Sequence, residues 1–200
     1  MIRFQAPLLL ASQSPRRKQL LQMLGWDFRV QPSDITEIVP ENFPPPEVVM
    51  SLARQKVEDL IDQFPESLIL AADTIVVLDE VILGKPKDPE EAFQMLKMLS
   101  GRSNTVFTGI CLAQGISKRM VTAVEQSEVF FYPMSDIEIR RYVASGSPMD
   151  KAGAYGIQDD WGALFIERIE GDYYNVMGLP LHLLYKTLKL NFADLWQMDE

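Results

Sequence analysis

Residues 8–25 have the sequence LLLASQSPRRKQLLQMLG. The apolar residues 8–11 predict a strand, and residues 15–24 predict a helix that begins after the cap residue Ser14 and ends at Gly25. A strand that passes through a short polar turn into a helix is a building unit of α/β folds. The stretch therefore predicts an α/β fold.

The rest of the chain alternates in the same way between strand-like and helix-like segments. The apolar periodicity predicts helices after the prolines at 44–46 and at 88–99, 135–144 and 180–190, and strands at 26–31, 68–72, 75–78, 81–83, 104–113, 120–131 and 164–169. This order predicts a mixed sheet flanked by helices. We expect one domain over residues 1–190 and a weakly ordered C-terminal tail over residues 191–200.

The composition narrows the chemistry before any motif is considered. The net charge of −9 argues against DNA or RNA polymers as partners, because such proteins need an extended basic surface. One histidine, His182, and one cysteine, Cys111, cannot build a zinc cage or a Cys–His nucleophile pair. A metal would then be held mainly by oxygen, which favours Mg²⁺ or Mn²⁺, and a general base is expected to be a carboxylate.

The sequence also predicts a cytoplasmic protein that does not bind in a membrane. No apolar run approaches the ~18 residues of a membrane span. The first residues lack the long apolar stretch of a signal peptide, and a single cysteine fits a reducing compartment.

Two predicted helix starts share a cap followed by proline but differ in charge. Residues 88–91 are DPEE, which suits the helix dipole, whereas residues 14–18 are SPRRK. Three cations in a first turn oppose the dipole at a cost of a few tenths of a kcal/mol each. Ser12, Ser14 and the two arginines, together with the free N–H groups of the helix, form a candidate phosphate cradle. The alternative is a solvated basic turn.

Asp73 places a carboxylate between two apolar runs. A buried aspartate is costly unless it is hydrogen-bonded, paired or bound to a metal. We therefore expect a metal ligand or general base at a strand end, the alternative being an aspartate that caps a turn.

Two loops add weaker signals. Residues 84–86, GKP, combine a close-approach glycine, a stiffening proline and Lys85, whose charge suits phosphate. Residues 150–158, DKAGAYGIQ, surround one aromatic ring with small residues and end in Gln158, which both donates and accepts hydrogen bonds. This second loop suits a flat ligand, and equally an ordinary glycine-rich connector.

Taken together, these segments resemble the Maf family of nucleotide pyrophosphatases, over about residues 8–190. The segments that carry the resemblance occur in one order: SQSPRR at 12–17, Glu37, Lys56, ADT at 72–74, GKP at 84–86, TG at 108–109 and DKAGAYGIQ at 150–158. The resemblance implies a Maf/ITPase-like fold with two lobes around a central cleft. It also implies hydrolysis of a nucleoside triphosphate between its α and β phosphates, a divalent metal cofactor, Mg²⁺ or Mn²⁺, and a homodimer as in many members.

The resemblance implies a role for each matching residue. Asp73 would be the general base and, with Glu37, a metal ligand. Phosphates would be held by Ser12, Ser14, Arg16, Arg17, Lys56 and Lys85. The base would be selected by Arg16, Thr74 and Gln158.

The branch of the family that this chain resembles is the dTTP/UTP pyrophosphatases. A sister branch, which prefers 7-methyl-GTP, has Trp after the Ser-Pro pair and Gln after the Asp, where this chain has Arg16 and Thr74. One departure from the branch is Asp159, where many relatives have glycine. The alternatives are the same reaction on 7-methyl-GTP or CTP, and a nucleotide-binding regulator of cell division without catalysis.

Overall fold

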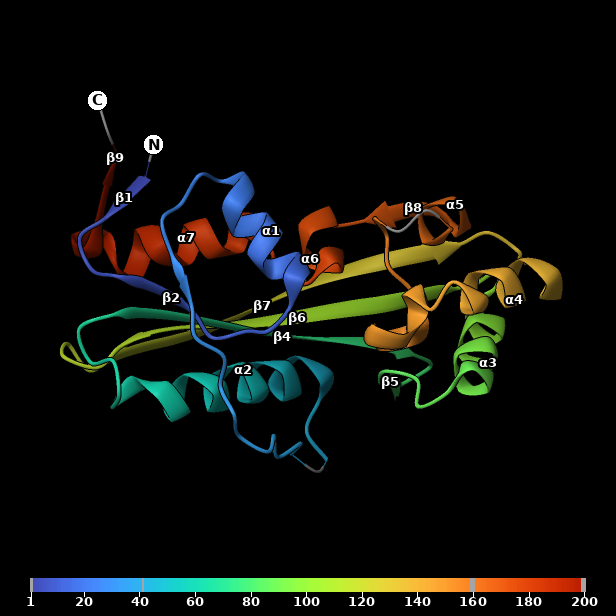
Figure 1. Cartoon of the computed structure of the whole chain (residues 1–200), viewed down its shortest axis with the longest axis horizontal. Helices are drawn as coiled ribbons and strands as arrows, with labels where there is room; N and C mark the ends of the chain where they lie inside the picture. Colours follow the sequence, from blue (N-terminus) through green and yellow to red (C-terminus); the bar gives the residue numbers. More distant parts are fainter. Residues whose placement is uncertain (1, 41, 159–160, 199–200) are drawn as a thin grey trace. The chain divides into compact units, whose positions relative to one another are not determined.

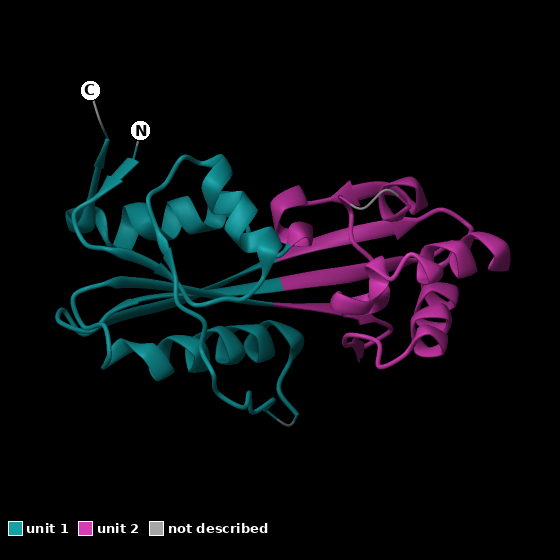
Figure 2. Cartoon of the chain, viewed as in Figure 1, with its two compact units in different colours: residues 1–73, 108–125, 178–200 teal, residues 74–107, 126–177 magenta. Residues whose placement is uncertain are grey.

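The computed structural model describes residues 2–40, 42–158 and 161–198. The chain divides into two compact units (Figure 2). Unit 1 consists of residues 1–73, 108–125 and 178–200, and unit 2 of residues 74–107 and 126–177. Three strands, β4 (Leu68–Leu78), β6 (Ser103–Gln114) and β7 (Arg119–Phe131), contribute residues to both units.

The main sheet is mixed, as predicted. Its strand order is β3-β2-β4-β6-β7-β8, and β5 pairs with β4 off this path. Strand β2 is parallel to β3 and β4, whereas β4–β5 and β7–β8 are antiparallel. The four further strands of this sheet are β2 (Leu8–Leu10), β3 (Arg29–Val30), β5 (Val81–Leu83) and β8 (Ile166–Glu170).

Unit 1 packs helices against its part of the sheet. Helix α2 (Pro45–Ile61) lies on one side of the strands, and α1 (Pro15–Met23) and α7 (Leu181–Asn191) lie on the other (Figure 1). Core side chains of α2, such as Ala53 and Val57, pack with residues of β2, β4 and β6 in one buried apolar cluster. This packing decides which residues of α2 face the strands.

Unit 2 is built around a second buried cluster. Helices α3 (Pro89–Leu99) and α4 (Asp136–Ala144) pack against one another and against two short 3₁₀ helices, η1 (Ser147–Asp150) and η2 (Ala152–Ala154). A capping box opens α4, since the side chains of Ser135 and Glu138 each bond the other's backbone N–H. The remaining helices are α5 (Gly162–Phe165) and α6 (Tyr173–Met177).

The strand expected at 26–31 is reduced to β3, Arg29–Val30, and two further strand predictions need correction. The segments expected at 68–72 and 75–78 are one continuous strand, β4, so Asp73 lies inside a strand and not at its end. The first residues of the segment expected at 164–169 belong to helix α5, and β8 begins only at Ile166. In both places the pairing with neighbouring strands decides the boundary, which local composition does not record.

The expectation of a weakly ordered tail is wrong for residues 191–198. Phe192 is fully buried, and the chain continues through η3 (Ala193–Leu195) into strand β9 (Trp196–Met198). Strand β9 pairs antiparallel with β1 (Ile2–Phe4) in a separate two-stranded sheet. The apolar residues of this segment are therefore used for pairing and burial. In the described part of the chain, no helix is long and apolar enough to cross a membrane.

Cys111 is buried in the interior of β6. Burial raises the pKa of its thiol to about 12, because the thiolate would lose its hydration. We expect iodoacetamide at pH 8 to leave Cys111 unmodified in the folded protein and to alkylate it in denaturant, as intact-mass measurement would report. Rapid alkylation without denaturant would contradict the burial.

Candidate functional site

The turn between β2 and α1 forms as the sequence predicts. Ser14 caps the helix in an extended conformation, its hydroxyl accepts the backbone N–H of Arg17 at 3.5 Å, and proline follows at the first helical position. The first turn contains no acidic residue. The helix therefore begins with cations beside its free N–H groups, an arrangement that favours an anion.

The hydroxyl of Ser12 lies beneath this turn and is nearly buried, at 8% exposure. It accepts the backbone N–H of Ser14 at 3.2 Å and Nη1 of Arg17 at 3.2 Å. Both hydrogen bonds use the oxygen as acceptor, and no acceptor for the hydroxyl proton lies in the described part of the chain. Ser12 can therefore donate this proton to a bound anion.

Arg17 holds the turn as well as adding charge to it. Its Nε donates to the carbonyl of Gly178, 161 residues away, at 2.8 Å. Burial lowers the pKa of the guanidinium, whereas the charge of Asp73 raises it; the charge of Arg16 lowers it and that of Glu37 raises it. The sequence had no signal for Gly178, because this partner is a backbone carbonyl that only the packing brings near.

Asp73, Lys56 and Glu37 form a second cluster in unit 1. The ammonium of Lys56 lies 2.6 Å from Oδ1 of Asp73 and 3.2 Å from Oε1 of Glu37. It also approaches the carbonyl of Ala72 at 3.5 Å. The side chains of Lys56 and Asp73 are only 12% and 14% exposed, whereas Glu37 is 42% exposed. One cation thus holds two carboxylates that come from different parts of the chain.

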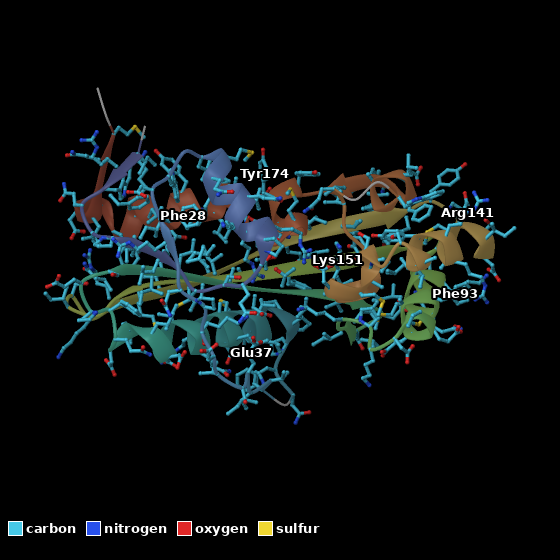
Figure 3. All side chains as sticks on the ribbon, in the orientation of Figure 1. Phe28, Glu37, Phe93, Arg141, Lys151 and Tyr174 are labelled. Atoms are coloured by element: carbon cyan, nitrogen blue, oxygen red, sulfur yellow. The ribbon has the colours of Figure 1, made fainter. Side chains whose placement is uncertain are left out.

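Two elements position this cluster. Asp73 is fixed by the interior of β4, and Lys56 by the face of α2 that covers the strands. Glu37 lies in the loop that leads to α2 (Figure 3). That loop is attached to the helix because Gln55 donates to the carbonyl of Ile38 at 2.8 Å and accepts its N–H at 2.9 Å. The hydrogen bonds between Gln55 and Ile38 therefore position the adjacent Glu37 near Lys56.

In unit 2 the structure joins the two loops that the sequence singled out separately. The N–H of Gly153 donates to the carbonyl of Gly84 at 3.0 Å, beside the exposed Lys85. Gly153 has a φ of +68°, and an added Cβ would lie 3.0 Å from a methyl group of Val76. Glycine is required there by both its conformation and its neighbour.

The second loop is not an ordinary flexible connector. Lys151 is 7% exposed, and its ammonium pairs with Oδ1 of Asp150 at 2.7 Å and donates to the carbonyl of Ser147. Two buried hydroxyls hold the residues that follow. Tyr155 donates to Oδ1 of Asn104 at 2.9 Å, and Tyr142 accepts the N–H of Gly156 at 3.1 Å. The sequence motif contained Lys151, but nothing in it indicated that the charge would be buried.

Gln158 follows this rigid segment. Its Oε1 is buried and has no hydrogen-bond partner among the described residues. A buried amide oxygen without a donor is costly, so a ligand that supplies one would be favoured here. Asp159, the departure noted in the sequence, lies outside the described residues.

The predicted site residues thus fall into three groups. Ser12, Ser14 and Arg17 are joined by hydrogen bonds, with Arg16 in the same helical turn. Glu37, Lys56 and Asp73 are joined by ion pairs. The third group, Thr74, Lys85 and Gln158, belongs to unit 2.

A divalent metal fits the second group only with help from a ligand. The described residues contain no cluster of three or more acidic, histidine or cysteine side chains that could hold a metal. Glu37 and Asp73 supply two carboxylates on one cation. Such a pair suits Mg²⁺, which usually takes one or two carboxylates and completes its shell with water and substrate phosphates.

A family model and curated sequences agree on one family. A family model described as "Maf-like protein" matches residues 7–191. The chain is 50% identical to the dTTP/UTP pyrophosphatase of Salinibacter ruber, covering 98% of this chain and 96% of that one. It is 51% identical to the protein of the same name from Halalkalibacterium halodurans, covering 92% and 96%. Among solved structures, the Ham1 protein of Staphylococcus aureus is similar in fold, with a TM-score of 0.53, 13% identity and coverage of 92% and 98%.

Proposed function

Since the chain belongs to the Maf-like protein family, we propose that it hydrolyses dTTP and UTP to the monophosphate and pyrophosphate. The observation that carries this proposal is the pairing of Asp73 and Glu37 on Lys56 in unit 1, together with the turn that Ser12 and Arg17 hold. This chemistry needs cations for phosphate oxygens and a base for water, and both are present. The name that the 50% identical relative carries supports the substrate.

The cations and donors would hold the triphosphate. The first turn of α1 offers N–H groups, the hydroxyl proton of Ser12 and two arginines. Phosphate contacts are proposed for Ser12, Ser14, Arg16, Arg17, Lys56 and Lys85. The positive charges of the arginines and lysines would offset the negative charge that moves to the leaving pyrophosphate as the bond breaks.

Asp73 would act as the general base. Lys56 holds its Oδ1, and no described residue bonds its Oδ2, which can take a proton. Water would attack the α phosphorus, its proton would pass to Asp73, and the bond from the α phosphorus to the bridging oxygen would break. The products are the nucleoside monophosphate and pyrophosphate.

A divalent metal would be held by Glu37 and Asp73, as Mg²⁺ or Mn²⁺. When bound it would neutralise charge on the phosphate oxygens. The presence of only two carboxylates in the cluster supports a metal that arrives with the nucleotide.

The base would be selected by Arg16, Thr74 and Gln158. A uracil or thymine edge presents an N–H donor beside carbonyl acceptors, and a glutamine amide can satisfy one of each. The buried Oε1 of Gln158, which lacks a described partner, supports this role, because the N3–H of the pyrimidine would supply its missing donor.

We expect Gln158→Ala to reduce the preference for UTP over GTP by about tenfold or more, the effect of losing one buried hydrogen bond of roughly 1.4 kcal/mol. The measurement is kcat/KM for both nucleotides by pyrophosphate release. Gln94→Ala, which changes an exposed glutamine of α3, serves as the matched control. An unchanged ratio in Gln158→Ala would remove the residue from base recognition.

A nucleotide panel tests the proposed function directly. UTP, dTTP, CTP, GTP and 7-methyl-GTP are each incubated with the wild-type protein, with Mg²⁺, with Mn²⁺ and with EDTA. We expect pyrophosphate from UTP and dTTP, and only with metal. Turnover of 7-methyl-GTP or CTP alone would reassign the substrate, and binding without turnover of any nucleotide would favour a regulator.

We place the enzyme in the cytoplasm, where its substrates are made and where its only cysteine would stay reduced. Its net charge of −9 supports small nucleotides, and not nucleic acid polymers, as partners. A homodimer is proposed from the family resemblance.

A further inference from the structure

Lys56 lies where two carboxylates converge. Its Nζ is 2.6 Å from Asp73 and 3.2 Å from Glu37, and the carbonyl of Ala72 is a third, weaker acceptor at 3.5 Å. An ammonium group has three N–H donors. Its acceptors come from strand β4, which follows α2 in the sequence, and from the loop that precedes α2. The carboxylates therefore surround the ammonium of Lys56 in the way that ligands surround a metal ion.

The same two carboxylates are the proposed metal ligands. An oxygen that already accepts a short ammonium hydrogen bond has less negative charge to offer a second cation. A divalent ion placed on Asp73 and Glu37 would also lie within a few ångströms of the ammonium, and like charges repel strongly in a half-buried site. Lys56 and a metal ion thus compete for one position.

We propose that Lys56 is a positioning residue that takes the place of the metal on Asp73 and Glu37 when no nucleotide is bound. Its ammonium keeps the two carboxylates together at low energetic cost, and it releases them when a triphosphate offers phosphate oxygens as new acceptors. The site would then bind metal weakly alone and well with substrate. This inference rests on the proposed function, because it takes the carboxylates to be metal ligands.

The proposal predicts that removal of Lys56 increases the affinity for a metal ion. Loss of a residue that only supports the structure would weaken metal binding, whereas removal of a competing cation should strengthen it. We expect Lys56→Met to bind Mn²⁺ in the absence of nucleotide about tenfold or more tightly than the wild type. The reason is that the substitution removes the repulsion between the ammonium group and the divalent ion. Electron paramagnetic resonance of free Mn²⁺ and calorimetry would measure the two dissociation constants.

The matched control is Arg54→Met. Arg54 lies two residues away on the same helix and is also a cation, but it pairs with Glu58 and is 60% exposed. Both variants change the net charge by −1, so general electrostatics would affect them alike. We expect Arg54→Met to bind Mn²⁺ as the wild type does.

A second variant and a second measurement protect the test from misfolding. Lys56→Gln keeps a polar side chain and should also gain Mn²⁺ affinity. In addition, Mn²⁺ should raise the unfolding temperature of either Lys56 variant more than that of the wild type, because ligand binding to the folded state stabilises it.

Equal Mn²⁺ affinity in the wild type and both Lys56 variants would overturn the proposal, and so would an equal gain in Arg54→Met. Failure of the proposed function is distinguishable, since it would appear in the wild-type nucleotide panel. Hydrolysis of UTP without the affinity gain would reject only the role of Lys56. The affinity gain without hydrolysis of any nucleotide would reject only the proposed reaction.

Discussion

Asp73→Asn should lower kcat for UTP by about 10²–10⁴-fold, the usual contribution of a positioned general base. Asparagine has nearly the same shape, but its amide cannot take a proton from water at neutral pH. The substitution leaves Lys56 with Glu37 as a partner at 3.2 Å, so the fold should be retained. The measurement is single-turnover hydrolysis of UTP at saturating metal, with circular dichroism to check the fold.

Asp136→Asn is the matched control for this result. Asp136 also forms an ion pair with a lysine, Lys97, but it is 58% exposed and lies at the start of α4. We expect its kcat to equal that of the wild type. If Asp73→Asn retained full turnover, Asp73 could not be the base, and the proposed mechanism would have to be abandoned.

Gly109→Ala should be strongly destabilising, because the added methyl group has no room in unit 1. Gly109 lies in β6 directly beneath α2, and an added Cβ would lie 2.5 Å from the carbonyl carbon of Val49 and 2.7 Å from the N of Met50. These atoms are helix backbone and cannot rotate away, so the helix must shift. Overpacking of this kind costs about 3 kcal/mol or more. At this chain length it should lower the unfolding temperature by about 10 °C.

Gly84→Ala makes the same chemical change where the structure has room. Apart from Gly84 and its two chain neighbours, no described residue has a heavy atom within 4 Å of an added Cβ at this position. We expect its free energy of unfolding, from urea titration, to lie within about 0.5 kcal/mol of the wild type. Similar stabilities for the two variants would show that α2 and β6 do not approach as closely as described.

The proposed mechanism also gives Gly109 a functional meaning. Helix α2 carries Lys56, and Asp73 lies in the neighbouring strand β4. Close approach of the helix backbone to the sheet is what allows a lysine to reach a carboxylate in the middle of a strand. A side chain at position 109 would push Lys56 away from Asp73, so Gly109→Ala should lose activity even at temperatures where it remains folded.

Much of the fold was predictable because its signals are local. The cap at Ser14, the capping box at Ser135 and the cap at Asp88 each depend on side chains within three residues of the backbone groups they bond. The turn at Asp79 and Glu80 likewise depends on its own residues, both of which have positive φ. Such interactions form in the same way wherever the segment is placed.

The sequence named the residues of the candidate site, but it did not indicate which of them contact one another. Arg17 stands out in the sequence because it is one of three cations in the first turn of a predicted helix, whereas Lys56 was named only through the family resemblance. Their partners are 161 and 17 residues away, and one of them is only a backbone carbonyl. The buried charge of Lys151 was missed for the same reason, since a lysine in a glycine-rich loop is usually solvated.

The C-terminal segment shows that a part of the fold also depends on contacts between residues distant in the sequence. Residues 191–198 carry no strong periodicity, yet Trp196–Met198 pairs with Ile2–Phe4 at the other end of the chain. Neither segment's own residues indicate which other segment it pairs with.

The amino-acid sequence alone was therefore sufficient for the chemical inventory of this protein: an α/β chain, oxygen and cation chemistry suited to phosphates, and one carboxylate between two apolar runs. Tertiary packing decided which of those groups meet. It put a lysine between two carboxylates, an arginine beside the carbonyl of a residue distant in the sequence, and an amide oxygen in a buried position. The physical reason is that burial and strand pairing act between residues that are close in space, even where they are far apart in the sequence.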